Sequence, residues 1–141
     1  MTFQLDSRLE ADTIPIGDLS LSSVLLLNDA RFPWFVLVPR VPNASEITDL
    51  SEEQSIQLMQ EIRIAARVMV ELSKPDKVNV GALGNIVTQL HVHVIGRFRD
   101  VLYTGTVDAG AMVLTLAGTA AVFVASLLLF GRAAVDLAKD V

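Results

Sequence analysis

The apolar positions in the first hundred residues fall into short segments with recognisable spacing. Val24 to Leu27 and Trp34 to Val38 are apolar runs rich in β-branched and aromatic residues, and residues 28–33 between them favour a turn. This pattern predicts a hairpin of two strands. Val78 to Ala82 and Leu90 to Ile95 predict two further strands, with glycines and an asparagine between them.

Two helices are predicted in the same part of the chain. Ser51 and Gln54 match a capping box, and apolar residues then recur at helical spacing until Pro75. This segment predicts one long helix whose apolar stripe packs on the sheet. Asp6 is placed to cap a short helix that ends near Pro15. Strands, a long helix and more strands predict an α+β fold with a mainly antiparallel sheet.

The apolar residues after Asp100 follow a different pattern. Ala109 to Gly131 is an uninterrupted run without a charged side chain. As a helix it would be about 35 Å long, slightly more than the ~30 Å of a bilayer's hydrocarbon core. We therefore expect a catalytic domain at residues 1–100 and a C-terminal hydrophobic tail at residues 101–141, with a candidate transmembrane helix at residues 109–131.

Other interpretations of this tail stay open. The segment could pack on the domain as a buried helix, or it could reflect a gene fusion or a frameshift. A surface helix fits less well, because Thr115, Thr119 and Ser126 are scattered among apolar residues and do not form a polar side. The first residues are charged and lack the apolar centre of a signal peptide. We expect a cytoplasmic domain, either anchored to a membrane by the tail or soluble.

Composition excludes several classes of function. The mean hydropathy of +0.50 is high because of the tail. The net charge is −5 and no cluster of basic residues stands out, so binding of a nucleic acid polymer is not expected. The chain has no cysteine, which excludes disulfide bonds, thiolate catalysis and cysteine-ligated zinc.

The two histidines of the chain, His91 and His93, lie two residues apart in a predicted strand. Alternation along a strand puts both imidazoles on one face, together with Gln89, and puts apolar side chains on the other face. An H-x-H pair can also be a surface feature or a chance metal site. The two histidines do not favour a zinc site, because a third ligand would have to be a distant carboxylate. No metal or other cofactor is expected.

The residues around the histidines resemble the signature of the histidine triad (HIT) family. They read Gly84-Asn85-Ile86-Val87-Thr88-Gln89-Leu90-His91-Val92-His93-Val94-Ile95-Gly96-Arg97. In that family, histidines alternate with apolar residues along a strand. The order of the upstream elements is also similar: a strand ending at Asn28 and Asp29, a strand ending at Pro39, and a long helix. The resemblance covers roughly residues 1–100.

The resemblance implies a nucleotide hydrolase or transferase. His91 would attack the α-phosphate of a nucleotide and carry it as a phosphoramidate, and His93 would orient the site and help to protonate the leaving group. Asn28 or Asp29 falls where the family binds the ribose hydroxyls. Asn85 and Thr88 lie on the approach to the triad strand and could donate hydrogen bonds to phosphate. A homodimer, formed through the helix and the sheet edge, is expected on the same basis.

Two positions depart from the family pattern. Gln89 replaces the first histidine of the triad, and Trp34 stands where many members place another histidine. Glutamine can hold a group by hydrogen bonds but cannot exchange a proton, so Gln89 is expected to keep a positioning and binding role. We interpret the departures as a variant enzyme that hydrolyses or transfers nucleotides. A non-catalytic nucleotide-binding or sensing module is the alternative.

Overall fold

One antiparallel sheet organises the part of the chain that the structure describes. The computed structural model describes residues 2–29 and 31–99. Within these residues, five strands pair in the order β1-β2-β3-β5-β4. They are β1 (Thr13–Asp18), β2 (Ser22–Leu27), β3 (Trp34–Pro39), β4 (Lys77–Ala82) and β5 (Val92–Arg97). Every neighbouring pair is antiparallel, and β5 lies between β3 and β4 although it follows both in sequence.

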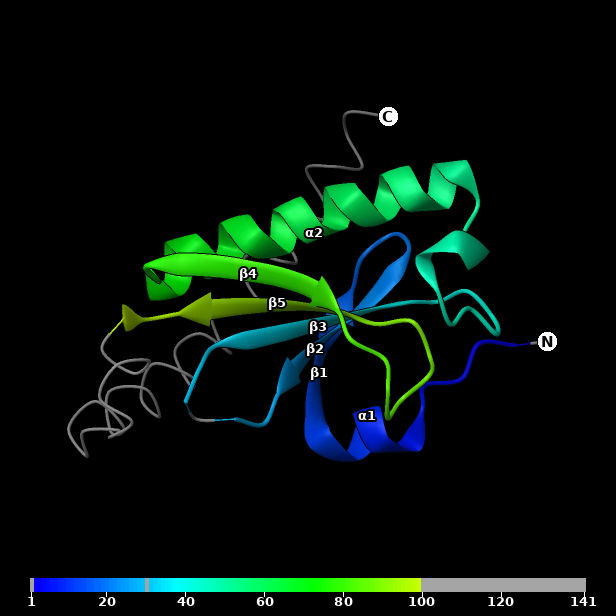
Figure 1. Ribbon diagram of the computed structural model, residues 1–141, viewed down its shortest axis with the longest axis horizontal. Helices are drawn as coiled ribbons and strands as arrows, with labels where there is room; N and C mark the ends of the chain where they lie inside the picture. Colours follow the sequence, from blue (N-terminus) through cyan, green and yellow to red (C-terminus); the bar gives the residue numbers. More distant parts are fainter. Residues whose placement is uncertain (1, 30, 100–141) are drawn as a thin grey trace.

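Helices lie on both faces of this sheet. The long helix α2 (Glu52–Ser73) crosses one face, and the short helix α1 (Ser7–Asp12) lies on the opposite side (Figure 1). A 3-10 turn, η1 (Ile47–Asp49), precedes α2. The α+β fold with an antiparallel sheet and one long helix is therefore confirmed. The predicted hydrophobic helix at 109–131 lies outside the described residues, and none of the helices within residues 2–29 and 31–99 has the length and apolar character to cross a bilayer.

The ends of α2 are those that the sequence predicts. The Ser51 hydroxyl accepts from the Gln54 amide at 3.2 Å, and the Gln54 side chain accepts from the Ser51 amide at 2.9 Å. This reciprocal pair satisfies two backbone N–H groups that the first helical turn leaves without partners. At the other end Lys74 adopts a left-handed conformation and its amide reaches the Val70 carbonyl, after which Pro75 cannot continue the helix.

Strand β3 is buried on both faces, which explains its unbroken apolar sequence. Phe35 and Leu37 pack with residues of α2, whereas Val36 and Val38 pack with Leu9 of α1. Successive side chains of a strand point to opposite faces, so covering both faces removes the alternation of polar and apolar residues. The sheet thus has two apolar layers, and the layer on the α1 side is the one that adjoins the histidines.

The first strand was not predicted from the sequence. Helix α1 starts after Asp6 as expected, since the Asp6 side chain accepts from the Arg8 amide. Thr13–Asp18 then forms β1 on the sheet edge, where the sequence predicts only the end of the helix near Pro15. The register shifts between Pro15 and Gly17. Proline is tolerated at an edge, and this irregularity hides the two-residue period.

Strand β5 begins and ends later than expected. The sequence predicted a strand from Leu90 to Ile95, but the observed limits are Val92–Arg97. The Leu90 amide donates to the Ala44 carbonyl at 2.9 Å, so Leu90 bonds to the connection before α2. At the far end, the Gly96 amide donates to the Pro33 carbonyl and prolongs the contact with the β2–β3 hairpin. His91 therefore lies immediately before the strand.

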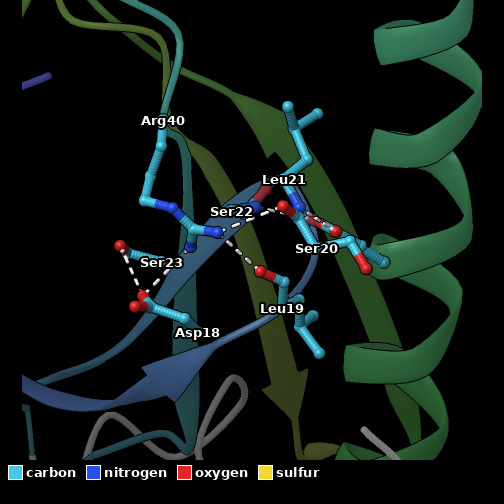
Figure 2. A network of polar contacts seen from close by, with 8 residues as sticks. Asp18, Leu19, Ser20, Leu21, Ser22, Ser23 and Arg40 are labelled. Atoms are coloured by element: carbon cyan, nitrogen blue, oxygen red, sulfur yellow. Dashed lines mark hydrogen bonds and ion pairs between the residues drawn. The ribbon is translucent and has the colours of Figure 1, made fainter. Parts of the chain in front are cut away.

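A polar network fixes the turn between β1 and β2. Arg40 donates from Nη2 to the carbonyls of Leu19 and Ser20 and pairs with Asp18 at 3.1 Å (Figure 2). From the helix side, the fully buried carboxylate of Glu61 accepts from the amides of Leu21 at 2.6 Å and Ser22 at 3.0 Å. A buried carboxylate is stable only with such donors, so α2 and the turn hold each other in place.

Candidate active site

The two histidines face the side of the sheet opposite α2. Val92 and Val94 are 2% and 0% exposed and pack in the core beneath α2. His93 pairs with Val36, which belongs to the layer on the α1 side. The imidazole rings of His91 and His93 lie edge to face, with centroids 4.8 Å apart. The predicted clustering of both imidazoles on one face is thus what the structure contains.

A backbone hydrogen bond orients the ring of His91. Its Nδ1 lies 2.7 Å from the carbonyl oxygen of Gln89. A carbonyl oxygen can only accept a hydrogen bond, so in the neutral ring Nδ1 carries the proton and Nε2 carries the lone pair. The residue is only 5% exposed and lines a pocket of about 190 Å³ that also includes Leu83, Gly84 and Thr88. His91 therefore offers an unprotonated nitrogen from a ring held in one orientation.

The ring of His93 is held in the complementary tautomer. The indole Nε1 of Trp34 donates to Nδ1 of His93 at 2.9 Å. Since an indole N–H is only a donor, Nδ1 of His93 must be unprotonated and the neutral ring carries its proton on Nε2. Burial is the largest cause that lowers the pKa of His93 below its usual value, and the nearby His91 lowers the pKa further. A hydrogen bond with the Leu83 backbone acts in the opposite direction. Burial and the hydrogen bond from Trp34 both favour the neutral form of His93.

Trp34 is the site residue whose role sequence reasoning did not identify. It was seen as a departure from a histidine pattern, and no partner could be assigned to it. In the structure Trp34 pairs with Ile95, two residues from His93, so the indole reaches His93 diagonally across the two strands. The signal in the sequence was Trp34 itself, an aromatic residue whose indole N–H can donate a hydrogen bond and which lies in another predicted strand.

Gln89 binds the N-terminal segment of the chain. Its Nε2 donates to the Gln4 carbonyl at 2.8 Å, and its Oε1 accepts from the Asp6 amide at 2.9 Å. Arg8 adds a third link, because its Nη1 donates to the Ile86 carbonyl at 3.0 Å. Gln89 is predicted from the sequence to bind substrate, and in the structure both ends of its amide bond to the backbone of residues 4 and 6.

A larger pocket adjoins the one at His91. It has a volume of about 540 Å³ and lies between the N-terminal segment and residues 42–45. Ser45, Thr88 and Gln89 line both pockets, so the two are neighbours on either side of these residues. Thr88, predicted to bind phosphate, is therefore at the junction. Neither pocket holds three side chains of the types that bind metal ions, and no such group occurs elsewhere in residues 2–29 and 31–99.

The other predicted binding residues are not among those that line these two pockets. Asn28 and Asp29 are in the β2–β3 turn, at the end of the sheet where β5 finishes, whereas His91 lies where β5 starts. Asp29 pairs with Arg31 at 2.6 Å, and hydrogen bonding to Arg31 lowers the pKa of Asp29. Asn85 is exposed in the bend before the histidines. The structure thus brings His91, His93, Thr88 and Gln89 together and leaves Asn28 and Asp29 at the other end of β5, while Asn85 follows the pocket residue Gly84 in the chain.

Comparison with known proteins identifies the family. Residues 8–100 match the HIT domain. The chain is 32% identical over 88 residues to the AP-4-A phosphorylase of Mycobacterium tuberculosis (strain H37Rv), a match that covers 58% of this chain and 45% of that protein. The chain thus spans less than half the length of this relative.

Solved structures agree with this assignment. A histidine triad protein from Bradyrhizobium japonicum is 55% identical, with a TM-score of 0.69 over 70% of this chain and 73% of that one. A histidine triad protein from Marinobacter aquaeolei VT8 is 38% identical, with a TM-score of 0.72 over 87% of this chain and 97% of that one. The chain belongs to the HIT domain family.

Proposed function

We propose that this protein is a nucleotide hydrolase or transferase that cleaves a nucleotide conjugate or dinucleoside polyphosphate at the α-phosphate through a covalent nucleotidyl-His91. The observation that carries the proposal is the hydrogen bond from Nδ1 of His91 to the Gln89 carbonyl. This bond leaves the lone pair on Nε2, which is the form of imidazole that attacks phosphorus near neutral pH.

The reaction takes place in two displacements. In the first, Nε2 of His91 forms a bond to the α-phosphorus while the bond to the leaving group breaks, and the leaving group takes up a proton. His93 contacts the His91 ring. We propose that His93 orients the site and helps to supply this proton. In the second, water or another acceptor gives a proton to His93, which lost one in the first step, and attacks the same phosphorus. The phosphorus–nitrogen bond breaks and the nucleotide is released.

We propose that the bound nucleotide lies along β5. The turn with Asn28 and Asp29 would hold the ribose, and Thr88 and Asn85 would hold phosphate. Gln89, whose side chain bonds to the backbone of Gln4 and Asp6, would shape the phosphate site from its position in both pockets. Thr88 lines the pocket at His91, which supports its place in this group. The ionised carboxylate of Asp29 is an acceptor that suits ribose hydroxyls. The relative named AP-4-A phosphorylase supports nucleotide chemistry in general.

A trapping experiment tests the covalent step. The full-length protein is mixed with dinucleoside tetraphosphate or nucleoside phosphoramidate labelled at the α-phosphate, and is then denatured in alkali, which preserves phosphorus–nitrogen bonds. We expect label on the wild-type chain and on the control Glu71→Gln, whose side chain is exposed on α2. His91→Ala should carry none. Turnover by His91→Ala at more than a few per cent of the wild-type rate would remove His91 from its role.

A second candidate function is a non-catalytic nucleotide-binding or sensing module. The observation that favours it is Gln89, which replaces a titratable histidine and has both polar atoms bound to the backbone. Saturable nucleotide binding without turnover and without trapped label would support this function against the enzyme.

Assembly and location complete the proposal. We expect the HIT-like catalytic domain at residues 1–100 to form a homodimer, because Ile56, Met59 and Val70 on α2 and Val80 on the edge strand β4 expose about half of their surface. We also propose that the apolar residues 109–131 anchor the domain to a membrane from the cytoplasmic side. A domain that is free in the cytoplasm is the alternative.

A further inference from the structure

The carboxylate of Asp29 is bound by Arg31 within the β2–β3 turn. Arg31 donates from Nε to Oδ1 at 3.0 Å and from Nη2 to Oδ2 at 2.6 Å, and its backbone amide donates to Oδ1 at 2.9 Å. A carboxylate and a guanidinium that meet through two parallel hydrogen bonds form a strong and well-oriented ion pair. Arg31 therefore fixes the direction in which Asp29 offers its remaining lone pairs.

These bonds use most of the acceptor capacity of Asp29. A carboxylate has about four acceptor sites, two on each oxygen. The backbone amide and Nε of Arg31 use both sites of Oδ1, and Nη2 uses one site of Oδ2. About one site on Oδ2 is left for a ligand, and a longer contact from Nε at 3.2 Å competes for it. The 2′- and 3′-hydroxyls of a ribose donate two hydrogen bonds, so Asp29 can accept only one of them while Arg31 is bound.

Asn28 is the neighbouring residue that can receive the other hydroxyl. Its backbone amide donates to the Asp12 carbonyl at 3.0 Å, which ties the turn to the end of α1. Asn28 is exposed to solvent. A hydrogen bond to an exposed amide oxygen replaces a bond to water and adds little net affinity. A ligand that lacks this hydroxyl should therefore bind almost as well.

Arg31 also removes the penalty that normally makes a polar site selective. A site rejects a ligand that lacks one hydroxyl chiefly because its own buried acceptor is then left without a partner. The side chain of Asp29 is only 15% exposed, so an unpaired carboxylate at this position would be costly. With Arg31 in place, the carboxylate stays paired whether or not a hydroxyl is present. The ion pair thus lets Asp29 bind a hydroxyl without requiring one.

We propose that Arg31 is a specificity-determining residue, which occupies Asp29 and so makes the nucleoside end of the site tolerant of a sugar that lacks its 2′- or 3′-hydroxyl. The ligands of the site then include deoxynucleotides as well as ribonucleotides. The inference rests on the proposed placement of the ribose at Asn28 and Asp29, which it makes more specific. Arg31 itself is 65% exposed, so its replacement leaves the core of the sheet intact.

The ion pair itself is tested without a ligand. The side-chain hydrogen bonds from Arg31 are the largest cause that lowers the pKa of Asp29. Arg31→Leu removes these donors, so the pKa of Asp29 should rise in an NMR titration of its carboxyl carbon in the full-length protein. Arg31→Lys keeps the charge but loses the planar fork and should give a smaller rise, and Glu71→Gln, exposed on α2, should give none. An unchanged pKa in Arg31→Leu would overturn the inference, because Arg31 would not be occupying the carboxylate.

The specificity is tested with nucleotides that differ only in their sugar hydroxyls. Adenosine 5′-monophosphate and its 2′-deoxy and 3′-deoxy analogues are titrated calorimetrically into the full-length protein. In the wild type, loss of either hydroxyl should raise Kd by no more than about fivefold. In Arg31→Leu, loss of at least one hydroxyl should raise Kd by about twentyfold or more, because Asp29 would then lack a partner. Adding Asp29→Ala to Arg31→Leu should restore the wild-type ratio, since no carboxylate is then left unpaired.

The outcomes separate this inference from the proposed function. If none of the three nucleotides binds saturably to the wild type, the proposed function and this inference both fail. If all three bind with Kd ratios that Arg31→Leu leaves unchanged, this inference alone fails, because a purely structural Arg31 would weaken all three equally. A wild-type preference of about twentyfold or more for the ribonucleotide would also overturn it, since Asp29 would then be open to the ribose. The expected ratios without covalent label on His91 would support this inference and overturn the enzyme.

Discussion

The indole nitrogen of Trp34 donates a hydrogen bond to Nδ1 of His93 across 2.9 Å, and this bond joins β3 to β5 on the face that carries both histidines. Protonation of Nδ1 would turn an acceptor into a donor facing another donor. Trp34→Phe keeps the aromatic packing and removes the donor. We expect the pKa of His93 to rise in this variant, as measured by NMR titration of the imidazole protons. A pKa that is unchanged or lower would contradict the role of the indole.

The lowered pKa of His93 links folding to pH. Burial is the first cause of the depression, so the unfolded chain binds a proton at His93 more readily than the folded chain does. This contribution to stability is present above the unfolded pKa of about 6.5 and is lost as pH falls from there to the folded pKa. The free energy of unfolding should decline over that acidic range, and His93→Gln should show a shallower decline in urea titrations. Equal slopes would exclude His93 as the source.

Substitutions of His91 and Val92, which are adjacent in sequence and face opposite sides of the sheet, should separate effects on activity from effects on packing. His91→Ala should abolish turnover and, because the ring is 5% exposed and bonds to the Gln89 carbonyl, should cost about 1–2 kcal/mol of stability. Val92→Ala should cost on the order of 1–3 kcal/mol through lost burial under α2 and retain turnover. Thermal unfolding and single-turnover rates measure both. A fully stable His91→Ala would mean that the ring contributes nothing to packing.

Glu61 is expected to be the most sensitive carboxylate of α2. Its oxygens accept from the amides of Leu21 and Ser22 and from the side chain of Gln57. Glu61→Ala would leave buried donors without a partner, with an expected cost of about 3 kcal/mol or more. Glu71→Ala, on the exposed side of the same helix, should change stability by less than about 0.5 kcal/mol. Similar losses in both variants would show that the β1–β2 turn does not depend on Glu61.

The proposed membrane anchor is tested by fractionation. The full-length protein should remain with the membrane pellet until detergent is added, whereas a chain ending at Asp100 should not. Val122→Arg, a change of roughly +3 kcal/mol at the bilayer centre, should shift the full-length protein toward the supernatant. Recovery of the unmodified protein from the supernatant without detergent would refute the anchor.

Local patterns in the sequence predicted the parts of the fold that depend on local interactions. The capping box at Ser51 and the stop at Pro75 set the limits of α2 within a residue or two, because each acts within one helical turn. Alternation around His91 and His93 identified the buried face of β5 for the same reason. These features require no knowledge of distant residues.

Features that depend on distant residues were missed. β1 contains Pro15 and a shifted register, so its pairing with β2 determines its conformation more than its own propensity does. The contact of Gln89 with Gln4 and Asp6 joins opposite ends of the described chain, and no local pattern marks it. The hydrogen bond from Trp34 to His93 likewise depends on the register of β3 against β5.

The position of β5 between β3 and β4 affects the order in which the molecule can be completed during translation. Of the described strands it emerges last from the ribosome, and until then β3 has an unpaired edge and β4 has no neighbour in the sheet. Such edges can pair with other chains, so a partly translated molecule is open to aggregation at this stage. The strand that protects these edges is the one that follows directly on His91 and contains His93. The nascent chain therefore gains its protection from misassembly and its histidine site in the same step.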